Sequence, residues 1–399
     1  MPDENPQPAK VSPRRRGWFL PTVAILFLLL ALAAGWLMFF DSQPMFLPAT
    51  LLRAYPLHVL LLSLLALVVL GFALRRHRWP AATAAGLAVA LSAATGLVPM
   101  AAAGDTAAAA GVQVRLGEYL ANAASANFGK PDPARTVRYA TPGGHGLDMD
   151  IWPSEDANSR KAVLLIHGGG WSGGNRGMTP EWNRLLTRQG FTVFDIEYRM
   201  AGDVPPGTAW QATVSDSKCA LAWITANAAK YRIDPDRISV FGQSAGGHLA
   251  LMTAYTSGTD AFKPSCDLPE GRIRSAVDFY GPYDLIAFAT GPDGTDAGRS
   301  ILNTVLGGSA AEQTERYRTF SPSSYVRAGL PPTLILQGER DFLVPQSQSR
   351  LLDEALGKAG VPHRAHFLPY TDHAFDVGWG SYQTQLARSA VTDFLAERG

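Results

Sequence analysis

Apolar residues are concentrated in three long runs near the N-terminus of this 399-residue chain. Residues 17–40, 54–74 and 79–104 contain no Asp, Glu, Lys or Arg. At 1.5 Å of rise per residue, about 20 helical residues cross the roughly 30 Å hydrocarbon core of a bilayer. Each run exceeds that length, so the pattern predicts three transmembrane helices.

The third run carries the weakest signal. Ala and Gly dominate it, whereas Leu, Phe, Val and Ile dominate the first two. A secretory signal peptide is the alternative for the first run, but that run is longer than an ordinary signal core and two more apolar runs follow it. Cleavage near residues 101–103 is a further alternative, and it would release the rest of the chain as a soluble protein.

Beyond residue 110, short apolar runs alternate with amphipathic segments. Residues 114–129 predict a connecting helix, and residues 215–230 carry apolar side chains at helical spacing. Runs of strand length occupy residues 147–152, 162–167, 191–198, 238–243, 275–281 and 333–338. Near-continuous apolar strands that alternate with helices are typical of a mostly parallel sheet covered on both faces. The pattern therefore predicts an α/β domain.

Charge divides the chain at the same place. The sequence holds 35 Lys and Arg against 34 Asp and Glu, but residues 1–110 hold 8 against 4 and residues 111–399 hold 27 against 30. The net charges are therefore +4 and −3. The near-zero total argues against nucleic acid as a partner, because phosphate binding requires a concentrated positive excess. We expect a membrane anchor at 1–110, a linker at 111–134 and a catalytic domain at 135–399.

The arginines predict the orientation of the anchor in a cell membrane. Arg14, Arg15 and Arg16 precede the first span, and three more arginines lie at residues 75–78 between the second and third. By the positive-inside rule, the N-terminus and this second loop are cytoplasmic. Three crossings then place residues 105–399 on the outer side. Without the third crossing, the large domain would lie inside.

A candidate nucleophile lies between a predicted strand and a predicted helix. The string Gly242-Gln243-Ser244-Ala245-Gly246 follows ISVF and precedes GHLALMTA. A serine on a sharp strand-to-helix turn needs small neighbours, because the backbone is strained there and other chains pass close by. Ser244 would be held above the sheet edge at the positive end of the following helix.

A glycine-rich loop follows the predicted strand at 162–167. Three glycines after His167 leave backbone N–H groups free to point at a developing negative charge. We assign Gly169 and Gly170, together with the N–H of Ala245, as an oxyanion hole. Trp171 is a candidate for the substrate pocket or a packing residue. His167 leaves the strand beside the loop and is expected to order the turn, and His248 is given the same structural interpretation.

A serine nucleophile needs a base, and the base needs an orienting carboxylate. Asp341 follows the predicted strand at 333–338, and His373 follows a later strand segment. The order Ser, Asp, His is the one this architecture uses. Glu339 is the competing acid, but the FLVP segment after Asp341 would hold that loop. His363 and His366 lie on the strand itself, whereas His373 follows it.

At this point the sequence resembles a known family. From about residue 135 to 399 it is similar to the α/β-hydrolase superfamily, in particular the esterases and lipases related to hormone-sensitive lipase and to BD-FAE-type feruloyl esterases. The matching stretches are LDMDIWP, AVLLIHGGGW, IDPDRISVFGQSAGGHLALM, VDFYGPYDL, LPPTLILQGERDFLVP and DHAFD. The resemblance implies the α/β-hydrolase fold and acyl transfer to Ser244. His373 would act as general base and then acid, with Asp341 as its orienter, and no cofactor is implied. The three predicted spans depart from this family, whose members of this type are mostly soluble.

Two cysteines and one insertion complete the candidate features. Cys219 and Cys266 are 47 positions apart and have no metal-ligand pattern around them, so we expect no metal site. An oxidising compartment would allow a disulfide between them, whereas the cytoplasm would leave two thiols. The segment 285–323, rich in Gly, Ala and Thr, is a candidate lid over the site.

The leading functional hypothesis is a membrane-anchored serine carboxylester hydrolase. Its expected partners are a small-molecule or lipid-like ester substrate and the membrane lipid around the N-terminal helices. A serine peptidase or amidase on the same fold is the first alternative. A non-catalytic, membrane-anchored binding domain is the second, although a binding module has no need of nucleophile, acid, base and oxyanion glycines together.

Overall fold

The computed structural model describes residues 18–40, 46–122, 127 and 132–399. These residues form two compact units. The helical unit comprises residues 18–40 and 56–98, and the α/β unit comprises the described residues among 41–55 and 99–399. This division differs from the expected one, because the segment between the first two apolar runs belongs to the α/β unit.

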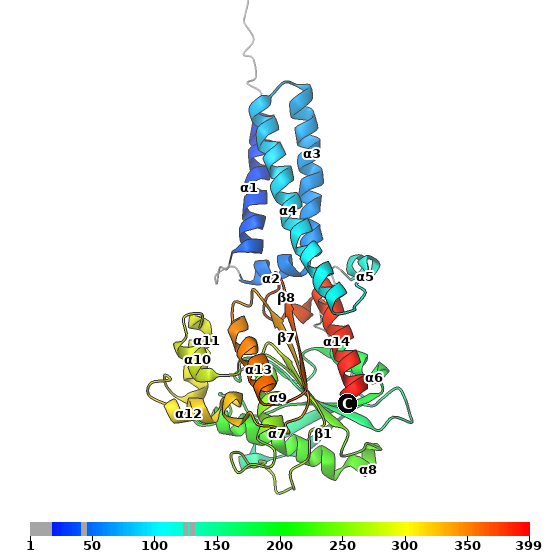
Figure 1. The fold of residues 1–399 in the computed structure, drawn as a ribbon, viewed down its shortest axis with the longest axis vertical. Helices are drawn as coiled ribbons and strands as arrows, with labels where there is room; N and C mark the ends of the chain where they lie inside the picture. Colours follow the sequence, from blue (N-terminus) through cyan, green and yellow to red (C-terminus); the bar gives the residue numbers. More distant parts are fainter. Residues whose placement is uncertain (1–17, 41–45, 123–126, 128–131) are drawn as a thin grey trace, which may run out of the picture. The chain divides into compact units, whose positions relative to one another are not determined.

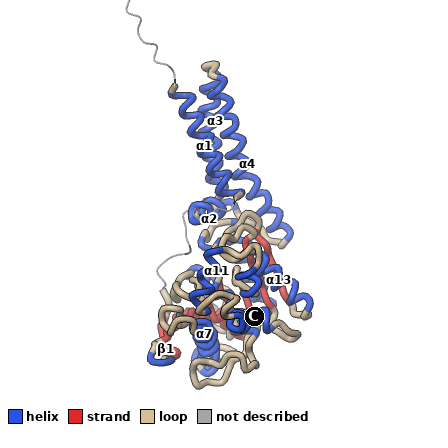
Figure 2. The backbone as a smooth tube through the Cα atoms, turned by 90° about the vertical axis from the view of Figure 1, so that its left-hand side faces the viewer, coloured by secondary structure: helices blue, strands red, loops and turns tan. Residues whose placement is uncertain are grey.

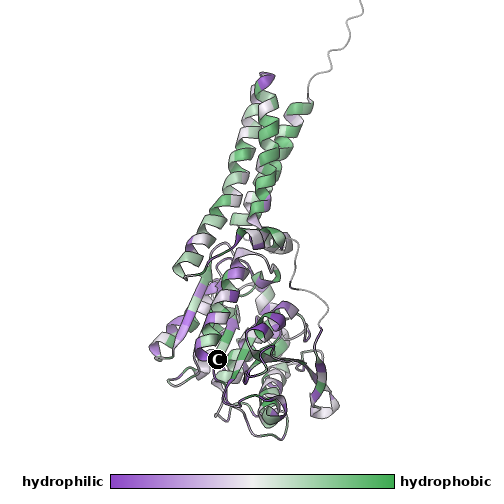
Figure 3. Cartoon of the chain, turned by 90° about the vertical axis from the view of Figure 1, so that its right-hand side faces the viewer, coloured by the Kyte–Doolittle hydropathy of each residue, from purple (hydrophilic) through white to green (hydrophobic). Residues whose placement is uncertain are grey.

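The helical unit is built from α1 (Phe19–Phe39), the short turn η2 (Pro56–His58), α3 (Val59–Arg75) and most of α4 (Trp79–Ala109). All three long helices have the length and apolar composition to cross a membrane, with mean hydropathies of 2.5, 2.7 and 1.7. Figure 3 shows apolar colouring along them. These are the three predicted spans, but α4 runs five residues beyond the predicted end at residue 104.

Small residues form the contacts inside the helical unit. Ala31, Ala66 and Ala88 are fully buried together, one from each long helix. A buried hydrogen bond of 2.6 Å joins the hydroxyl oxygens of Ser63 and Ser92. Small side chains let helix backbones approach closely, and this is the usual packing mode where lipid surrounds the helices.

The α/β unit contains one eight-stranded sheet with the order β1-β2-β4-β3-β5-β6-β7-β8. Strands β7 and β8 lie side by side in Figure 1. Its strands are β1 (Arg135–Ala140), β2 (Leu147–Trp152), β3 (Lys161–Ile166), β4 (Phe191–Ile196), β5 (Ile238–Gln243), β6 (Ala276–Phe279), β7 (Thr333–Gly338) and β8 (His363–Leu368). The pairings from β4 to β8 are parallel, and only β1–β2 and β2–β4 are antiparallel. The sheet is mostly parallel, as predicted.

Strand β3 illustrates why the central strands have nearly continuous apolar sequences. Ala162, Leu164 and Ile166 join the hydrophobic core on one face, whereas Val163 and Leu165 join the core on the other. Successive side chains on a strand point to opposite faces, so a sheet covered on both sides needs apolar residues at every position. In Figure 2, helices flank the strands of this unit.

Helices cover both faces of the sheet. The helices with residues in the larger core are α7 (Ala209–Ala226), α8 (Ala228–Tyr231), α9 (Ala245–Tyr255), α10 (Leu285–Thr290), α11 (Asp296–Leu306), α12 (Thr314–Thr319) and α13 (Gln346–Lys358). Those with residues in the second core are α6 (Pro180–Arg188), α14 (Tyr382–Arg398) and the end of α4. Short 3₁₀ turns lie at η3 (Pro142–Gly144), η4 (Pro322–Tyr325) and η5 (Phe375–Val377).

Three local predictions need correction. Of the connecting helix expected at 114–129, the structure shows α5 (Leu116–Ala121), which begins two residues later and packs on α14 through Tyr119 and Tyr382; residues 123–126 and 128–129 lie outside the described residues. The helix expected at 215–230 begins earlier and is divided at Asn227. Strand β1 was not predicted, because its sequence RTVRYA alternates charged and apolar residues at an exposed sheet edge.

Candidate active site

Ser244 lies at a strained turn between β5 and α9. Its backbone has φ +55° and ψ −121°, a conformation that L-residues rarely adopt, and it is the residue before the first turn of α9. A Cβ at Gly242 would lie 2.0 Å from the carbonyl oxygen of Gly246. A Cβ at Gly246 would lie 2.0 Å from the carbonyl oxygen of Ile166. Glycine is therefore required on both sides of Ser244 because backbone occupies the space of a side chain.

The structure brings Ser244, His373 and Asp341 into one chain of hydrogen bonds. The Nε2 atom of His373 lies 2.9 Å from Oγ of Ser244, and its Nδ1 atom lies 2.7 Å from Oδ2 of Asp341. Both distances are within the range of a direct hydrogen bond. Three segments separated by up to 129 positions thus meet at the carboxyl ends of the parallel strands.

The loop after β7 holds the Asp341 carboxylate. Its Oδ1 atom accepts hydrogen bonds from the backbone N–H groups of Leu343 and Val344, at 2.9 and 2.8 Å. The side-chain amide of Gln337 donates to Oδ2 at 3.0 Å. These three donors fix the orientation of the Asp341 carboxylate independently of its contact with His373. Glu339, the competing acid, instead forms an ion pair with Arg350 at 3.2 Å.

The electrostatic surroundings of His373 favour its protonated form. Burial by itself lowers the pKa of this imidazole, but the carboxylates of Asp341, Asp372 and Asp376 outweigh burial, and the net pKa is raised. The phenol ring of Tyr280 packs beside the imidazole, with ring centroids 4.6 Å apart. The group that contacts Ser244 is therefore a buried base with increased proton affinity.

The glycine loop after β3 has a backbone that only glycine adopts readily. Gly169 and Gly170 have φ values of +116° and +59°, and the carbonyl of Gly169 accepts hydrogen bonds from the N–H groups of Ser172 and Gly173. A Cβ at Gly169 would lie 2.1 Å from the carbonyl oxygen of Gly173. The loop is thus a compact turn, and its glycines line the cavity that contains Ser244.

The two histidines given a structural interpretation contact neighbouring backbone. His167 is buried, its Nδ1 lies 2.7 Å from the carbonyl of Gly168, and burial lowers its pKa to about 4. His248 bonds the carbonyl of Phe320 at 2.6 Å, and burial lowers its pKa to about 3. Both side chains are neutral at physiological pH and order local structure.

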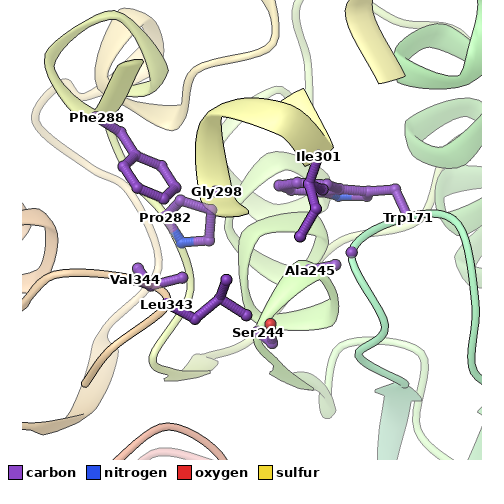
Figure 4. A pocket seen from close by; sticks show the side chains of 10 residues that line it. Trp171, Ser244, Ala245, Pro282, Phe288, Gly298, Ile301, Leu343 and Val344 are labelled. Carbon is purple, nitrogen blue, oxygen red and sulfur yellow. The ribbon is translucent and has the colours of Figure 1, made fainter. Parts of the chain in front are cut away.

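Two cavities meet at Ser244. A small apolar cavity of about 20 Å³ is shown in Figure 4, where Leu343 and Ile301 point toward Ser244. Its lining residues are Gly170, Trp171, Ser244, Ala245, Pro282, Phe288, Gly298, Ile301, Leu343 and Val344. Phe288 and Ile301 come from α10 and α11, so the segment expected as a lid supplies part of the wall.

The second cavity, of about 270 Å³, lies on the side of His373. It is also mainly apolar, with Met178, Tyr280, Ala374 and Val377 in its wall. Four residues, Gly170, Ser244, Ile301 and Leu343, line both cavities, whereas His373 lines only the larger one and Trp171 only the smaller one. The smaller cavity and the larger one therefore extend from the serine in different directions relative to the base.

Sequence reasoning missed a buried network around Asp376. This carboxylate accepts hydrogen bonds from Trp182 Nε1 at 2.7 Å, Gln243 Nε2 and the Tyr280 hydroxyl. Burial raises the pKa of Asp376. Because Gln243 precedes Ser244 in the chain, the network braces the nucleophile turn. The available signal was the position of Asp376 three residues after His373 in the DHAFD string.

Cys219 and Cys266 form a disulfide in the structure, with their Cα atoms 5.5 Å apart. The bond links α7 to the loop after α9. In the parts of the chain that the structure describes, no group of three or more His, Cys, Asp or Glu side chains is arranged to hold a metal ion.

Comparison with known proteins identifies the family. The model of the BD-FAE family matches residues 148–356, which is more than half of the chain. The chain belongs to the BD-FAE family. It is 33% identical over 268 residues to the esterase LipQ of Mycobacterium tuberculosis, a match that covers 64% of this chain and 60% of LipQ. The chain thus spans about 60% of the length of that curated relative.

Solved structures of esterases share the BD-FAE chain's fold. A truncated carbohydrate esterase from gut microbiota superposes with a TM-score of 0.57 and 27% identity, covering 68% of this chain and 98% of that one. A butyrate-bound esterase from Thermogutta terrifontis gives a TM-score of 0.55 and 27% identity, covering 66% and 94%. The predicted α/β-hydrolase fold is therefore confirmed, as is the predicted resemblance to esterases.

Proposed function

We propose that this BD-FAE protein is a serine carboxylic ester hydrolase. The observation that carries the proposal is the hydrogen-bonded chain from Ser244 Oγ through His373 to the buried Asp341 carboxylate. A base within 3 Å of a serine hydroxyl, itself oriented by a carboxylate, is the arrangement that activates a serine for acyl transfer. The esterase names of the relatives support the same reaction class.

In the proposed mechanism, Ser244 Oγ attacks the ester carbonyl while His373 Nε2 accepts its proton. The carbonyl oxygen becomes an oxyanion, which the N–H groups of Gly169, Gly170 and Ala245 stabilise. His373 then gives the proton to the departing alcohol, leaving an acyl group on Ser244. Water attacks that acyl group with His373 again as base, and Ser244 is regenerated. Asp341 holds the Nδ1–H of His373 throughout.

The two cavities divide the substrate into an acyl side and an alcohol side. His373 must protonate the leaving alcohol, so the alcohol occupies the cavity that His373 lines, of about 270 Å³. The acyl group then extends into the small cavity beside Trp171 and Ile301, of about 20 Å³. A space of this size holds roughly one water molecule. We infer that the preferred substrates have a short acyl group and a larger apolar alcohol.

We infer further that the protein is a multi-pass membrane protein with a cytoplasmic N-terminus and its α/β unit outside. The arginine distribution supports this orientation. So does the membership of residues 46–55 in the α/β unit, because a loop between the first two spans lies on the same side as that unit only when the third helix also crosses. The Cys219–Cys266 disulfide is consistent with an oxidising compartment.

The direct test is hydrolysis of p-nitrophenyl esters by the full-length protein and by Ser244→Ala. We expect acetyl and propionyl esters to be cleaved faster than octanoyl esters, and Ser244→Ala to lower kcat by roughly 10³-fold or more. Ser389→Ala is the matched control, because Ser389 lies on α14 and bonds Asp393; its activity should equal that of the wild type.

Three outcomes would contradict the proposal. Undiminished hydrolysis by Ser244→Ala would exclude the mechanism. Faster cleavage of peptide anilides than of esters would favour a peptidase or amidase. A folded wild-type protein that cleaves neither class, and whose serine does not react with a fluorophosphonate, would favour a non-catalytic binding domain.

A further inference from the structure

Helix α2 (Phe46–Ala54) has an unexpected location for a segment between two spans. It belongs to the α/β unit, and its residue Arg53 is buried, with 2% of its side chain exposed. Arg53 forms an ion pair of 3.1 Å with Asp372, which is also 2% exposed. A buried charge is costly unless it is paired, so removal of either side chain would leave its partner as an uncompensated buried charge.

Arg53 bridges the two loops that carry the catalytic acid and base. Its Nη1 atom donates to Oδ2 of Asp372 at 3.1 Å and to the backbone carbonyl of Arg340 at 3.2 Å. Asp372 immediately precedes His373, and Arg340 immediately precedes Asp341. One guanidinium group therefore contacts both loops one residue away from His373 and Asp341, the base and its orienting carboxylate.

The other oxygen of Asp372 connects the same two loops. Its Oδ1 atom accepts the backbone N–H of His373 at 2.9 Å and that of Phe342 at 3.2 Å. The Thr50 hydroxyl of α2 donates to Oδ2 at 3.2 Å. Burial raises the pKa of Asp372, and the positive charge of Arg53 opposes that rise. Arg53 thus favours the charged carboxylate that accepts the His373 N–H.

Further contacts hold the end of α2 in place. The side-chain amide of Gln383 donates to the carbonyl of Arg53 at 3.2 Å, and the Tyr55 hydroxyl donates to the carbonyl of Asn122 at 3.0 Å. The Tyr55 ring packs edge-on against Tyr119, with centroids 5.4 Å apart. These contacts, spread over α5 and α14, give Arg53 a defined position rather than a single surface contact.

We propose that Arg53 is a positioning residue for ester hydrolysis, acting through Asp372 and Arg340 to hold His373 and Asp341 in register with Ser244. This proposal rests on the proposed function. According to this proposal, the loop between the first two spans contributes to catalysis as well as to the membrane anchor. A chain that starts after residue 110 would lack this group.

The test uses the full-length protein in detergent, with Arg53→Met, Arg53→Lys and the control Arg76→Met, which removes an exposed arginine from the other short loop. A fluorophosphonate titration counts the reactive serines, so that kcat refers to folded sites. We expect Arg53→Met to lower kcat about 10- to 100-fold with KM within twofold, since small displacements of reacting groups cost rates of that size. Arg53→Lys should recover part of the loss because it restores the charge.

The pH profile provides a readout that a purely structural role would not move. The ionisable groups that face His373 are Asp341, Asp372, Asp376 and Tyr280. Loss of the positive charge in Arg53→Met should move the acid limb of kcat/KM to higher pH. Asp372→Asn removes a negative charge and should move it to lower pH.

Each outcome decides the proposal. A wild-type kcat and an unchanged acid limb in Arg53→Met would overturn it. If Arg53→Met fails to fold, Asp372→Asn and Thr50→Val decide instead, and wild-type kcat in both would overturn it. Wild-type protein that neither hydrolyses esters nor reacts with the fluorophosphonate would overturn the proposed function itself, which is a different result.

Discussion

The helical unit buries mainly small apolar side chains, whereas the α/β unit buries large ones. In the helical unit, Ala31 and Ala66 are fully buried, whereas Leu29 and Leu65 are 58% and 57% exposed. In the α/β unit, Trp182 is fully buried among aromatic rings, including Phe241 and Phe279. The largest apolar residues thus face outward in one unit and inward in the other.

The difference is the one expected if lipid surrounds the helical unit, as we propose, and water surrounds the α/β unit. In water, burying large apolar surfaces drives folding, so a Trp or Phe belongs in the core. In lipid, an exposed Leu costs nothing, and helices associate through close backbone contact and interhelical hydrogen bonds. The Ser63–Ser92 bond and the alanine contacts fit the second set of rules.

The largest expected difference between the two units comes from replacing one glycine by alanine in each. Gly246→Ala would place a methyl group 2.0 Å from the Ile166 carbonyl oxygen, whereas at Gly86 in α4 such a methyl group would meet no described atom within 4 Å apart from the nearby backbone of its own helix. We expect Gly246→Ala to lower the free energy of unfolding of the α/β unit by about 3 kcal/mol and to abolish activity. Gly86→Ala should be neutral or stabilising by about 0.5–1 kcal/mol.

Chemical denaturation followed by fluorescence and by esterase activity would measure both variants. An active, stable Gly246→Ala protein would show that the turn at Ser244 can relax. Conversely, a strong loss in Gly86→Ala would show that α4 has a partner at this position.

A difference of intermediate size is expected in how the two units respond to pH. Catalysis requires neutral His373, and the pKa of His373 is raised above its ordinary value of 6.5, so activity should fall as the pH drops through a pKa above 6.5. Below that pKa, kcat/KM should fall about tenfold per pH unit. Helix α1 has no ionisable side chain between Phe19 and Phe39, so helix content should be unaffected over the same range.

The measurement is kcat/KM from pH 5 to 9, with far-ultraviolet circular dichroism as the control. An acid limb at or below 6.5 would contradict the raised pKa. A parallel loss of helical signal would instead indicate acid unfolding.

The smallest expected effect tests the polar contact in the helical unit. Ser63→Ala leaves Ser92 its bond to the Ala88 carbonyl but removes the contact between helices α3 and α4. We expect a destabilisation of about 0.6 kcal/mol, typical of interhelical hydrogen bonds in membranes. Steric trapping or forced unfolding in bicelles can resolve such a change. A loss above 2 kcal/mol would mean that the pair carries more of the packing than alanine contacts do.

Local patterns were sufficient for much of the α/β unit. The predicted bounds of β5 and β7 coincide with the structure, where every position of both strands is buried. The preference for Asp341 over Glu339 rested on the FLVP segment, and the N–H groups of Leu343 and Val344 do hold its carboxylate.

Contacts distant in sequence could not be predicted in the same way. Asp376 and Tyr280 are 96 positions apart, and neither string around them shows that the two side chains meet. Arg53 and Asp372 are 319 positions apart, and Arg53 reads as a loop arginine at the end of an apolar run. The partners can be identified only in the folded structure, where the sheet brings the ends of β7 and β8 together.

The sequence separation of Arg53 and Asp372 also implies a delay between their synthesis on the ribosome. Ribosomes add roughly 5–20 residues per second, so the 319 residues between the two partners correspond to a delay of about 15 to 65 s. During that interval the first loop has been made while the histidine that it holds does not yet exist. The growing chain must therefore keep a cationic side chain available until the loop after β8 has been made.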